Sequence, residues 1–164
     1  MTTMLPMKFT QSTAELFETG WFYIGGRDRH YRPYNVIRPA VLMANQPKDP
    51  NDAIACVLLN VGFIFSYMLH DGVCEQIVSI MNQEGLALWG FNFSLMNSII
   101  KVLSEIQLGR SRGMYILNAA SFISALFKGV SYFLDASTLA KVQVSSSPTN
   151  ELVSKLIAPE QLEE

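Results

Sequence analysis

This 164-residue chain has few residues of the types and spacing that catalysis requires. His30 and His70 each lie near an aspartate in a segment typical of a turn, and neither is close to a nucleophile-elbow pattern. Cys56 and Cys74 lie in apolar surroundings without metal-site spacing, which favours buried free thiols in a reducing compartment. The sequence contains neither a Walker loop nor a G-x-G-x-x-G turn. We therefore expect no enzyme activity, no catalytic residue, no metal site and no cofactor.

A basic cluster is the next group that could do chemistry. Arg27, Arg29 and Arg32 lie in the stretch 25–33, where paired glycines and Pro33 predict a loop. Guanidinium groups suit phosphate headgroups or a protein partner, although a simple loop cluster gives the same pattern. The net charge of −2, from 12 basic and 14 acidic residues, argues against a general nucleic-acid binder.

The composition indicates apolar surface beyond that of an ordinary core. Hydrophobic residues make up 49% and charged residues 16% of the chain, against roughly 25% charged in an average soluble domain. The excess of hydrophobic residues would line a ligand cavity or contact a protein partner or a membrane surface. The most apolar run, 53–69, is short for a membrane span and is interrupted by Asn60, Gly62 and Ser66, so we expect a buried core helix. Residues 1–13 lack the pattern of a secretory signal, which favours a cytoplasmic protein.

Strand-like and helix-like segments alternate along the chain. The patterns predict strands at 34–43, 76–81, 114–117 and 141–144, the first bent at Pro39 or placed at a sheet edge. They predict helices at 52–69, 93–106, 122–134 and 148–157, with one helical turn near 14–18 and an extended piece at 86–89. This order predicts an α/β fold with a mainly parallel sheet and flanking helices.

The segment 121–133 does not have the pattern of an ordinary surface helix. Its polar residues form one narrow stripe, and the rest of its surface is apolar or small; the stripe consists of Ser121, Ser124, Lys128 and Ser131. Such a helix either packs fully into a core, or covers an apolar cavity with one face and meets a membrane or partner with another. Gly129 serves either close packing or flexing.

Two motifs flank this segment. Before it lies Tyr115-Ile116-Leu117-Asn118-Ala119, and after it lie Phe133-Leu134-Asp135, Thr138, Lys141 and Val142. They resemble "Y-I-x-N-A-P" and "F-L-D-x-x-T-x-x-K-I" of the CRAL-TRIO lipid-binding family, which includes yeast-type phosphatidylinositol/phosphatidylcholine transfer proteins and retinaldehyde- and tocopherol-binding proteins. Three further stretches, 27–33, 80–86 and 157–162, are similar to family segments in the same order.

The resemblance implies a mixed, mainly parallel sheet with flanking helices and an apolar cavity covered by a gate helix, 121–133. It implies a lipid-binding domain at 21–164 after an N-terminal extension at 1–20, without most of the family's N-terminal helical subdomain and truncated at its C-terminal end. Implied headgroup residues are Lys141 and Arg110. Implied cavity and gate residues are Leu86, Leu88, Tyr115, Leu117, Phe122, Leu126, Phe127, Val130 and Phe133.

The chain also departs from the family pattern. The acidic residue that pairs with the headgroup lysine in phosphoinositide-binding members falls at Gly109, and a small hydroxyl residue falls at Ala87. Asn82, Tyr31 and Ala120 replace the usual Asp, Gly and Pro. Two functions follow as expectations. One is non-enzymatic binding, with intermembrane transfer, of a hydrophobic ligand such as a phospholipid, by a cytoplasmic protein that meets membranes transiently. The other is a structural subunit that reuses the fold and buries its apolar surface against protein partners in a larger assembly.

Overall fold

A computed structural model describes residues 9–107, 109–119, 140–147, 151–158 and 161. Its centre is a five-stranded sheet in the order β1-β2-β3-β4-β5. The strands are β1 (Phe22–Arg27), β2 (Pro33–Ile37), β3 (Ile77–Asn82), β4 (Ser111–Leu117) and β5 (Val142–Val144). β1 pairs antiparallel with β2, and every later pair is parallel. The predicted α/β class with a mixed, mainly parallel sheet is confirmed.

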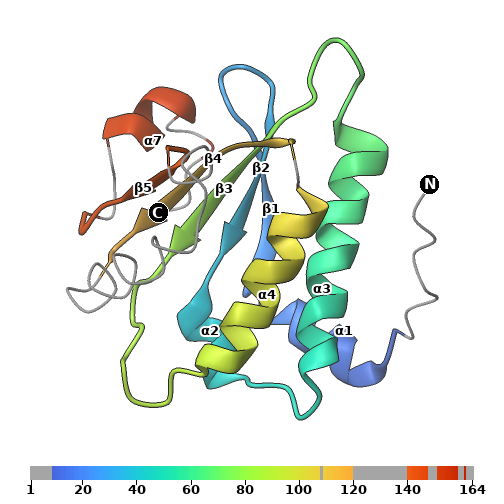
Figure 1. The fold of residues 1–164 in the computed structure, drawn as a ribbon, viewed down its shortest axis with the longest axis vertical. Helices are drawn as coiled ribbons and strands as arrows, with labels where there is room; N and C mark the ends of the chain where they lie inside the picture. Colours follow the sequence, from blue (N-terminus) through green and yellow to red (C-terminus); the bar gives the residue numbers. More distant parts are fainter. Residues whose placement is uncertain (1–8, 108, 120–139, 148–150, 159–160, 162–164) are drawn as a thin grey trace.

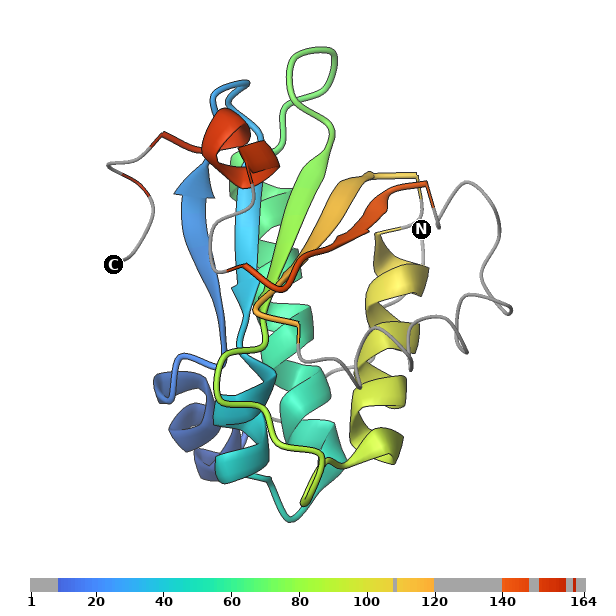
Figure 2. The same ribbon diagram turned by 90° about the vertical axis from the view of Figure 1, so that its left-hand side faces the viewer.

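Helices cover the sheet on both sides (Figure 1). On one side lie α1 (Gln11–Glu18), α2 (Pro39–Ala44), α3 (Pro50–Phe63) with its π-helical continuation η1 (Ile64–Met68), and α4 (Phe93–Ile106). On the other side lies the short α7 (Glu151–Leu156), seen from the front in Figure 2. The two layers arise because parallel strands bury both faces.

Side chains alternate between these two layers along each strand. On β3, Val78 and Ile80 pack in the α7 layer, whereas Met81 packs in the larger layer under α3 and α4. On β4, Tyr115 faces α7 and Ile116 faces the larger layer. The near-continuous apolar runs in the sequence are therefore explained by two-sided burial.

Proline positions explain one error in the predicted elements. The strand expected at 34–43 ends at Ile37, and Pro39 starts α2. A proline is well suited to a first helical turn, where no backbone donor is needed. The prediction of a strand through Pro39, bent or at a sheet edge, is therefore wrong, because Pro39 begins α2.

Glycines explain two further errors. The loop predicted at 25–33 is shorter, because Gly25 and Gly26 belong to β1, which was not predicted. Close packing requires glycine at position 25, since a side chain there would overlap the Tyr34 ring. The piece expected to be extended at 86–89 forms no strand, and it bends between Gly85 and Gly90, both with positive φ.

α3 lies against the sheet as the predicted core helix. Together, α3 and η1 span Pro50–Met68, which by length and mean hydropathy (1.4) could cross a membrane. Ala53, Cys56, Val57 and Val61 instead pack in the core beneath it. Burial raises the pKa of the Cys56 thiol to about 11, so this cysteine stays protonated at neutral pH, as expected for a buried free thiol.

A buried carboxylate fixes the N-terminal helix to α3. Asp52, in the first turn of α3, accepts hydrogen bonds from the hydroxyls of Thr13 (2.6 Å), Ser12 (2.8 Å) and Thr10 (2.9 Å) at the start of α1. The bond from Thr13 is the largest influence that lowers the pKa of Asp52, and burial opposes it. α1 therefore depends on an ionised partner 39 residues away.

We predict that Asp52→Asn destabilises the fold at pH 7 by about 1–3 kcal/mol, because hydrogen bonds to a charged acceptor are replaced by weaker ones. Since folding lowers the pKa of Asp52 from 3.8, this stability is present above that pH and is lost as the pH falls through the lowered pKa. Urea unfolding at pH 7 and below pH 4 should show a gap between wild type and variant that closes on acidification. The exposed Glu84→Gln variant serves as the control and should unfold like wild type.

Candidate functional site

The two predicted headgroup residues lie at the same edge of the sheet. Arg110 directly precedes β4 and Lys141 directly precedes β5, and these strands are parallel neighbours. The backbone fixes both positions, because Met114 N donates to Lys141 O (2.8 Å) and Ile77 N donates to Arg110 O (2.8 Å). The amino ends of the parallel strands thus bring two cations from distant parts of the sequence to one edge.

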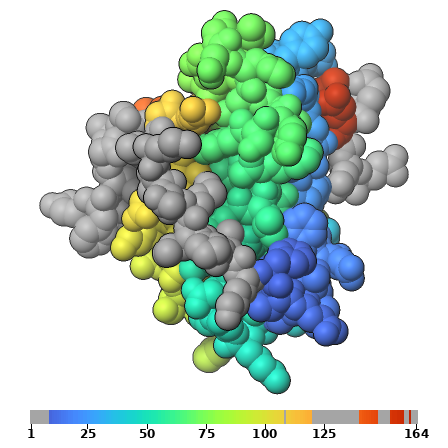
Figure 3. Space-filling model, turned by 90° about the vertical axis from the view of Figure 1, so that its right-hand side faces the viewer, coloured from blue at the N-terminus to red at the C-terminus, as the bar shows by residue number. Residues whose placement is uncertain are grey.

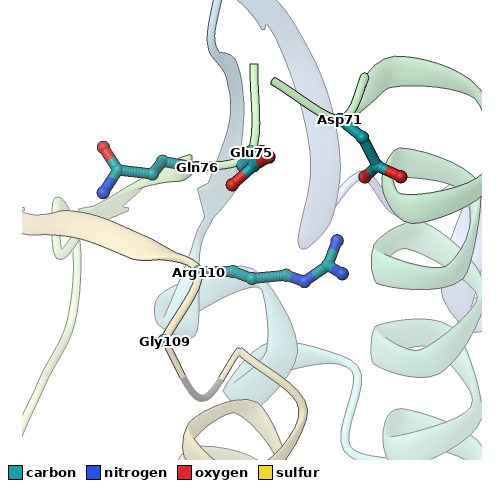
Figure 4. Close-up of a pocket in the computed structure, with 5 residues that line it drawn as sticks. All are labelled: Asp71, Glu75, Gln76, Gly109 and Arg110. Atoms are coloured by element: carbon teal, nitrogen blue, oxygen red, sulfur yellow. The ribbon is translucent and has the colours of Figure 1, made fainter. Parts of the chain in front are cut away.

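A polar hollow of about 330 Å³ opens beside Arg110. Its lining is Asp71, Glu75, Gln76, Gly109 and Arg110 (Figure 4). The Arg110 guanidinium lies 4.9 Å from the centre of the Phe65 ring, an arrangement that orients the cation by its attraction to the aromatic face. Within the described part of the chain, the one ion pair is between Arg32 and Asp28, so no carboxylate there pairs with Arg110.

Sequence reasoning missed the two carboxylates of this hollow. The sequence patterns indicate no functional role for Asp71 or Glu75. Both lie in the connection between η1 and β3, and both line the hollow that contains Gly109. Gly109 holds the position where the family resemblance places an acidic residue, so carboxylates from another loop lie near that place. Only the parallel pairing of β3 with β4 brings the two loops together.

The predicted cavity residues lie on different sides of the sheet. Tyr115 and Leu117 are buried in the α7 layer, with Val153 and Ile157 among their neighbours. Leu86 is buried in the opposite layer, and Leu88 is exposed. The predicted gate residues Phe122, Leu126, Phe127, Val130 and Phe133 lie outside the described residues.

The arginine cluster near β1 is largely engaged in fixing its own loop. Arg32 pairs with the buried Asp28 at 2.7 Å. Arg27 donates to the backbone oxygens of Tyr31 (2.6 Å) and Met68 (3.0 Å). These contacts hold Tyr31 at a φ of 62°, which a non-glycine residue rarely adopts. A second hollow of about 370 Å³ beside this loop is lined by Arg27, Asp28, Arg29, Tyr31, Ala158 and Gln161.

At the opposite edge, an amide pair joins the carboxyl ends of β3 and β4. Asn118 Nδ2 donates to Asn82 Oδ1 at 2.8 Å, and Asn118 has a φ of 54°. Asn82 Oδ1 also accepts from the backbone N of Glu84 at 3.0 Å. Asn118 thus sets the direction in which the chain leaves β4, towards the segment predicted as the gate.

We predict that Asn118→Val lowers the free energy of unfolding by about 1–2 kcal/mol more than Asn118→Gly. Both variants lose the bond to Asn82, but only glycine adopts positive φ without strain. Urea unfolding of the two variants measures the difference. Equal stabilities would show that the left-handed backbone at this position is not required.

Comparisons with known proteins agree with this architecture. The family model described as CRAL/TRIO domain matches residues 17–164. The solved structure titled "Crystal structure of Sfh5", from yeast, shares the fold with a TM-score of 0.63 at 13% identity, over 81% of this chain and 50% of that one. The match therefore spans half the length of that protein. A search of curated protein sequences finds no match. Because the family model covers nearly the whole chain, the chain belongs to the CRAL/TRIO domain family.

Proposed function

We propose that this chain binds a hydrophobic ligand such as a phospholipid in an apolar cavity and transfers it between membranes without chemical change. The family match over residues 17–164 carries this proposal, since CRAL/TRIO domains generally bind lipids or other small hydrophobic ligands. The protein works in the cytoplasm and meets membranes transiently. The segment 121–133 acts as the gate helix.

The physical task of such a protein is to shield acyl chains from water. Each buried CH₂ contributes about 0.8 kcal/mol, so a sixteen-carbon chain is held in a bilayer by roughly 12 kcal/mol. A cavity with a cover removes most of this barrier by replacing the bilayer interior with apolar side chains. The low fraction of charged residues, 16%, supports the presence of such an apolar lining.

A phosphate-containing headgroup suits the edge where Arg110 and Lys141 begin their strands. Phe65 orients the guanidinium, and no described carboxylate forms an ion pair with it. Asp71 and Glu75, across the same hollow, are suited to accept hydrogen bonds from headgroup hydroxyls or an ammonium group. The presence of cations and of separate carboxylates at this edge supports a headgroup that has both an anionic group and a group that donates hydrogen bonds.

The gate is tested by charge insertion. Phe127→Asp and Val130→Asp should abolish lipid pick-up, because a carboxylate cannot be buried against acyl chains. The matched control is Ser131→Asp on the polar stripe, which should bind lipid normally. Native mass spectrometry and lipid extraction after incubation with phospholipid vesicles give the occupancy. Normal pick-up by either gate variant would contradict the assignment.

The headgroup assignment is tested by removing the two charges. Arg110→Gln and Lys141→Gln should each reduce binding of phosphatidylinositol several-fold while changing phosphatidylcholine binding less, because phosphatidylinositol carries a net negative charge, whereas the choline ammonium of phosphatidylcholine balances its phosphate. Competition between the two lipids, read by mass spectrometry, measures the preference. Lys101→Gln, an exposed change on α4, is the control. An unchanged preference in both variants would place the headgroup elsewhere.

A structural role in a protein assembly is the second candidate function. It is favoured by an exposed apolar stripe along α3 and η1, formed by Leu59, Phe63 and Tyr67 at four-residue spacing. Figure 3 looks onto this side of the molecule. The occupancy measurement above separates the two functions: bound stoichiometric lipid supports transfer, whereas a stable protein complex without lipid supports the structural role.

A further inference from the structure

The connection between β3 and α4 presents apolar side chains to solvent. Trp89 is 91% exposed, and Leu88 and Phe93 are about half exposed. No charged residue occurs from Gly85 to Ile100. An almost fully exposed tryptophan costs hydration free energy unless something covers it.

Hydrogen bonds hold the exposed part of this connection, residues 88–93 (the tip), in a defined shape. Gln46 Nε2 donates to Gly90 O at 3.2 Å, and Asn92 Nδ2 donates to Gln46 Oε1 at 3.1 Å. Asn92 also caps α4 by accepting from Leu95 N at 3.0 Å. The loop is therefore tied to the connection before α3 and to the first turn of α4, and its apolar residues are presented by a fixed framework.

The tip lies at the carboxyl-end edge of the sheet. The connection leaves β3 just after Asn82, which is bonded to Asn118, and Gln83 N donates to Leu117 O at 3.0 Å. In Figure 1 the connection runs outward from the end of β3 before it turns into α4. The chain departs from β4 towards the proposed gate at this same edge.

We propose that Leu88, Trp89 and Phe93 form an anchor that inserts into the interfacial region of a lipid bilayer. This inference rests on the proposed lipid transfer and adds the surface through which the protein meets the membrane. Tryptophan and phenylalanine are suited to that region, because their rings are apolar while the indole N–H still reaches water. Lys48 is an exposed residue two positions after Gln46 in the supporting loop, and its ammonium group is suited to lipid phosphates.

A bilayer suits this tip better than a second copy of the chain does. A stable protein interface buries about 800 Å² on each partner. Aromatic side chains bury about 150–250 Å² each when fully covered, and only one of the three residues here is almost fully exposed. The tip is therefore too small for a stable dimer, whereas insertion into lipid requires no complementary surface.

The two tryptophans make a direct test. Trp21 is completely buried and Trp89 almost completely exposed, so a change in emission on adding phosphatidylcholine vesicles reports Trp89. We expect a blue shift and protection from iodide quenching, both absent in Trp89→Phe. Leu88→Ser and Trp89→Ser should weaken vesicle binding by about tenfold or more in sedimentation. The matched control is Val73→Ser, which changes an 86% exposed residue before β3, at the opposite edge of the sheet, and should bind like wild type.

The proposal is wrong if the tryptophan emission stays unchanged while the protein binds vesicles. It is also wrong if Val73→Ser weakens vesicle binding as much as Trp89→Ser does. A blue shift that appears without vesicles as protein concentration rises would assign the tip to a protein contact and also overturn it. Binding should persist at high salt, because insertion is apolar and not screened. Lipid pick-up is measured separately by extraction. Vesicle insertion without lipid pick-up would refute the proposed transfer and leave the anchor standing.

Discussion

Burial of a parallel sheet on both faces is the constraint on which the rest of this structure depends. From β2 to β5 every pairing is parallel, so each connection must cross over and cover a face. α3 and α4 supply one cover, and α7 supplies part of the other. The same topology collects the amino ends of the strands at one edge and the carboxyl ends at the other. The polar hollow beside Arg110 and the apolar tip at Trp89 therefore lie at opposite edges of one framework.

The parts of the fold that local pattern determines were predictable. The predicted helix at 93–106 is confirmed with the same bounds, because its apolar positions repeat at helical spacing and Asn92 caps it. The strand β3 follows from a short β-branched run, and β4 and β5 overlap the strands predicted at 114–117 and 141–144. Errors arose where one residue suits two elements. Pro39 is compatible with a bent strand or a first helical turn, and the glycines of β1 are compatible with a loop or with close packing against Tyr34.

Only those residues of the candidate site that belong to a family motif, or align with one, could be predicted from the sequence. Lys141 and Arg110 were singled out by resemblance, and the strand register then placed them at one edge. Asp71, Glu75 and Phe65 surround Arg110 through tertiary contacts between loops far apart in sequence, and no local pattern indicates such contacts. The exposure of Trp89 was likewise hidden, because an apolar loop residue has the same appearance in a sequence whether it is buried or not. Side-chain environment is a property of the assembled sheet.

The carboxylate that fixes α1 has a consequence for how the chain is made. Thr13 leaves the ribosome 39 residues before Asp52, so the first helix is synthesised well before its binding partner exists. Until α3 emerges, α1 lacks the helix against which it packs, and a helix as short as eight residues is unstable alone in water. The N-terminal segment must therefore wait as an unfolded, partly apolar nascent chain. Asp52 can capture this segment before α4, the other long helix of the larger layer, has been synthesised.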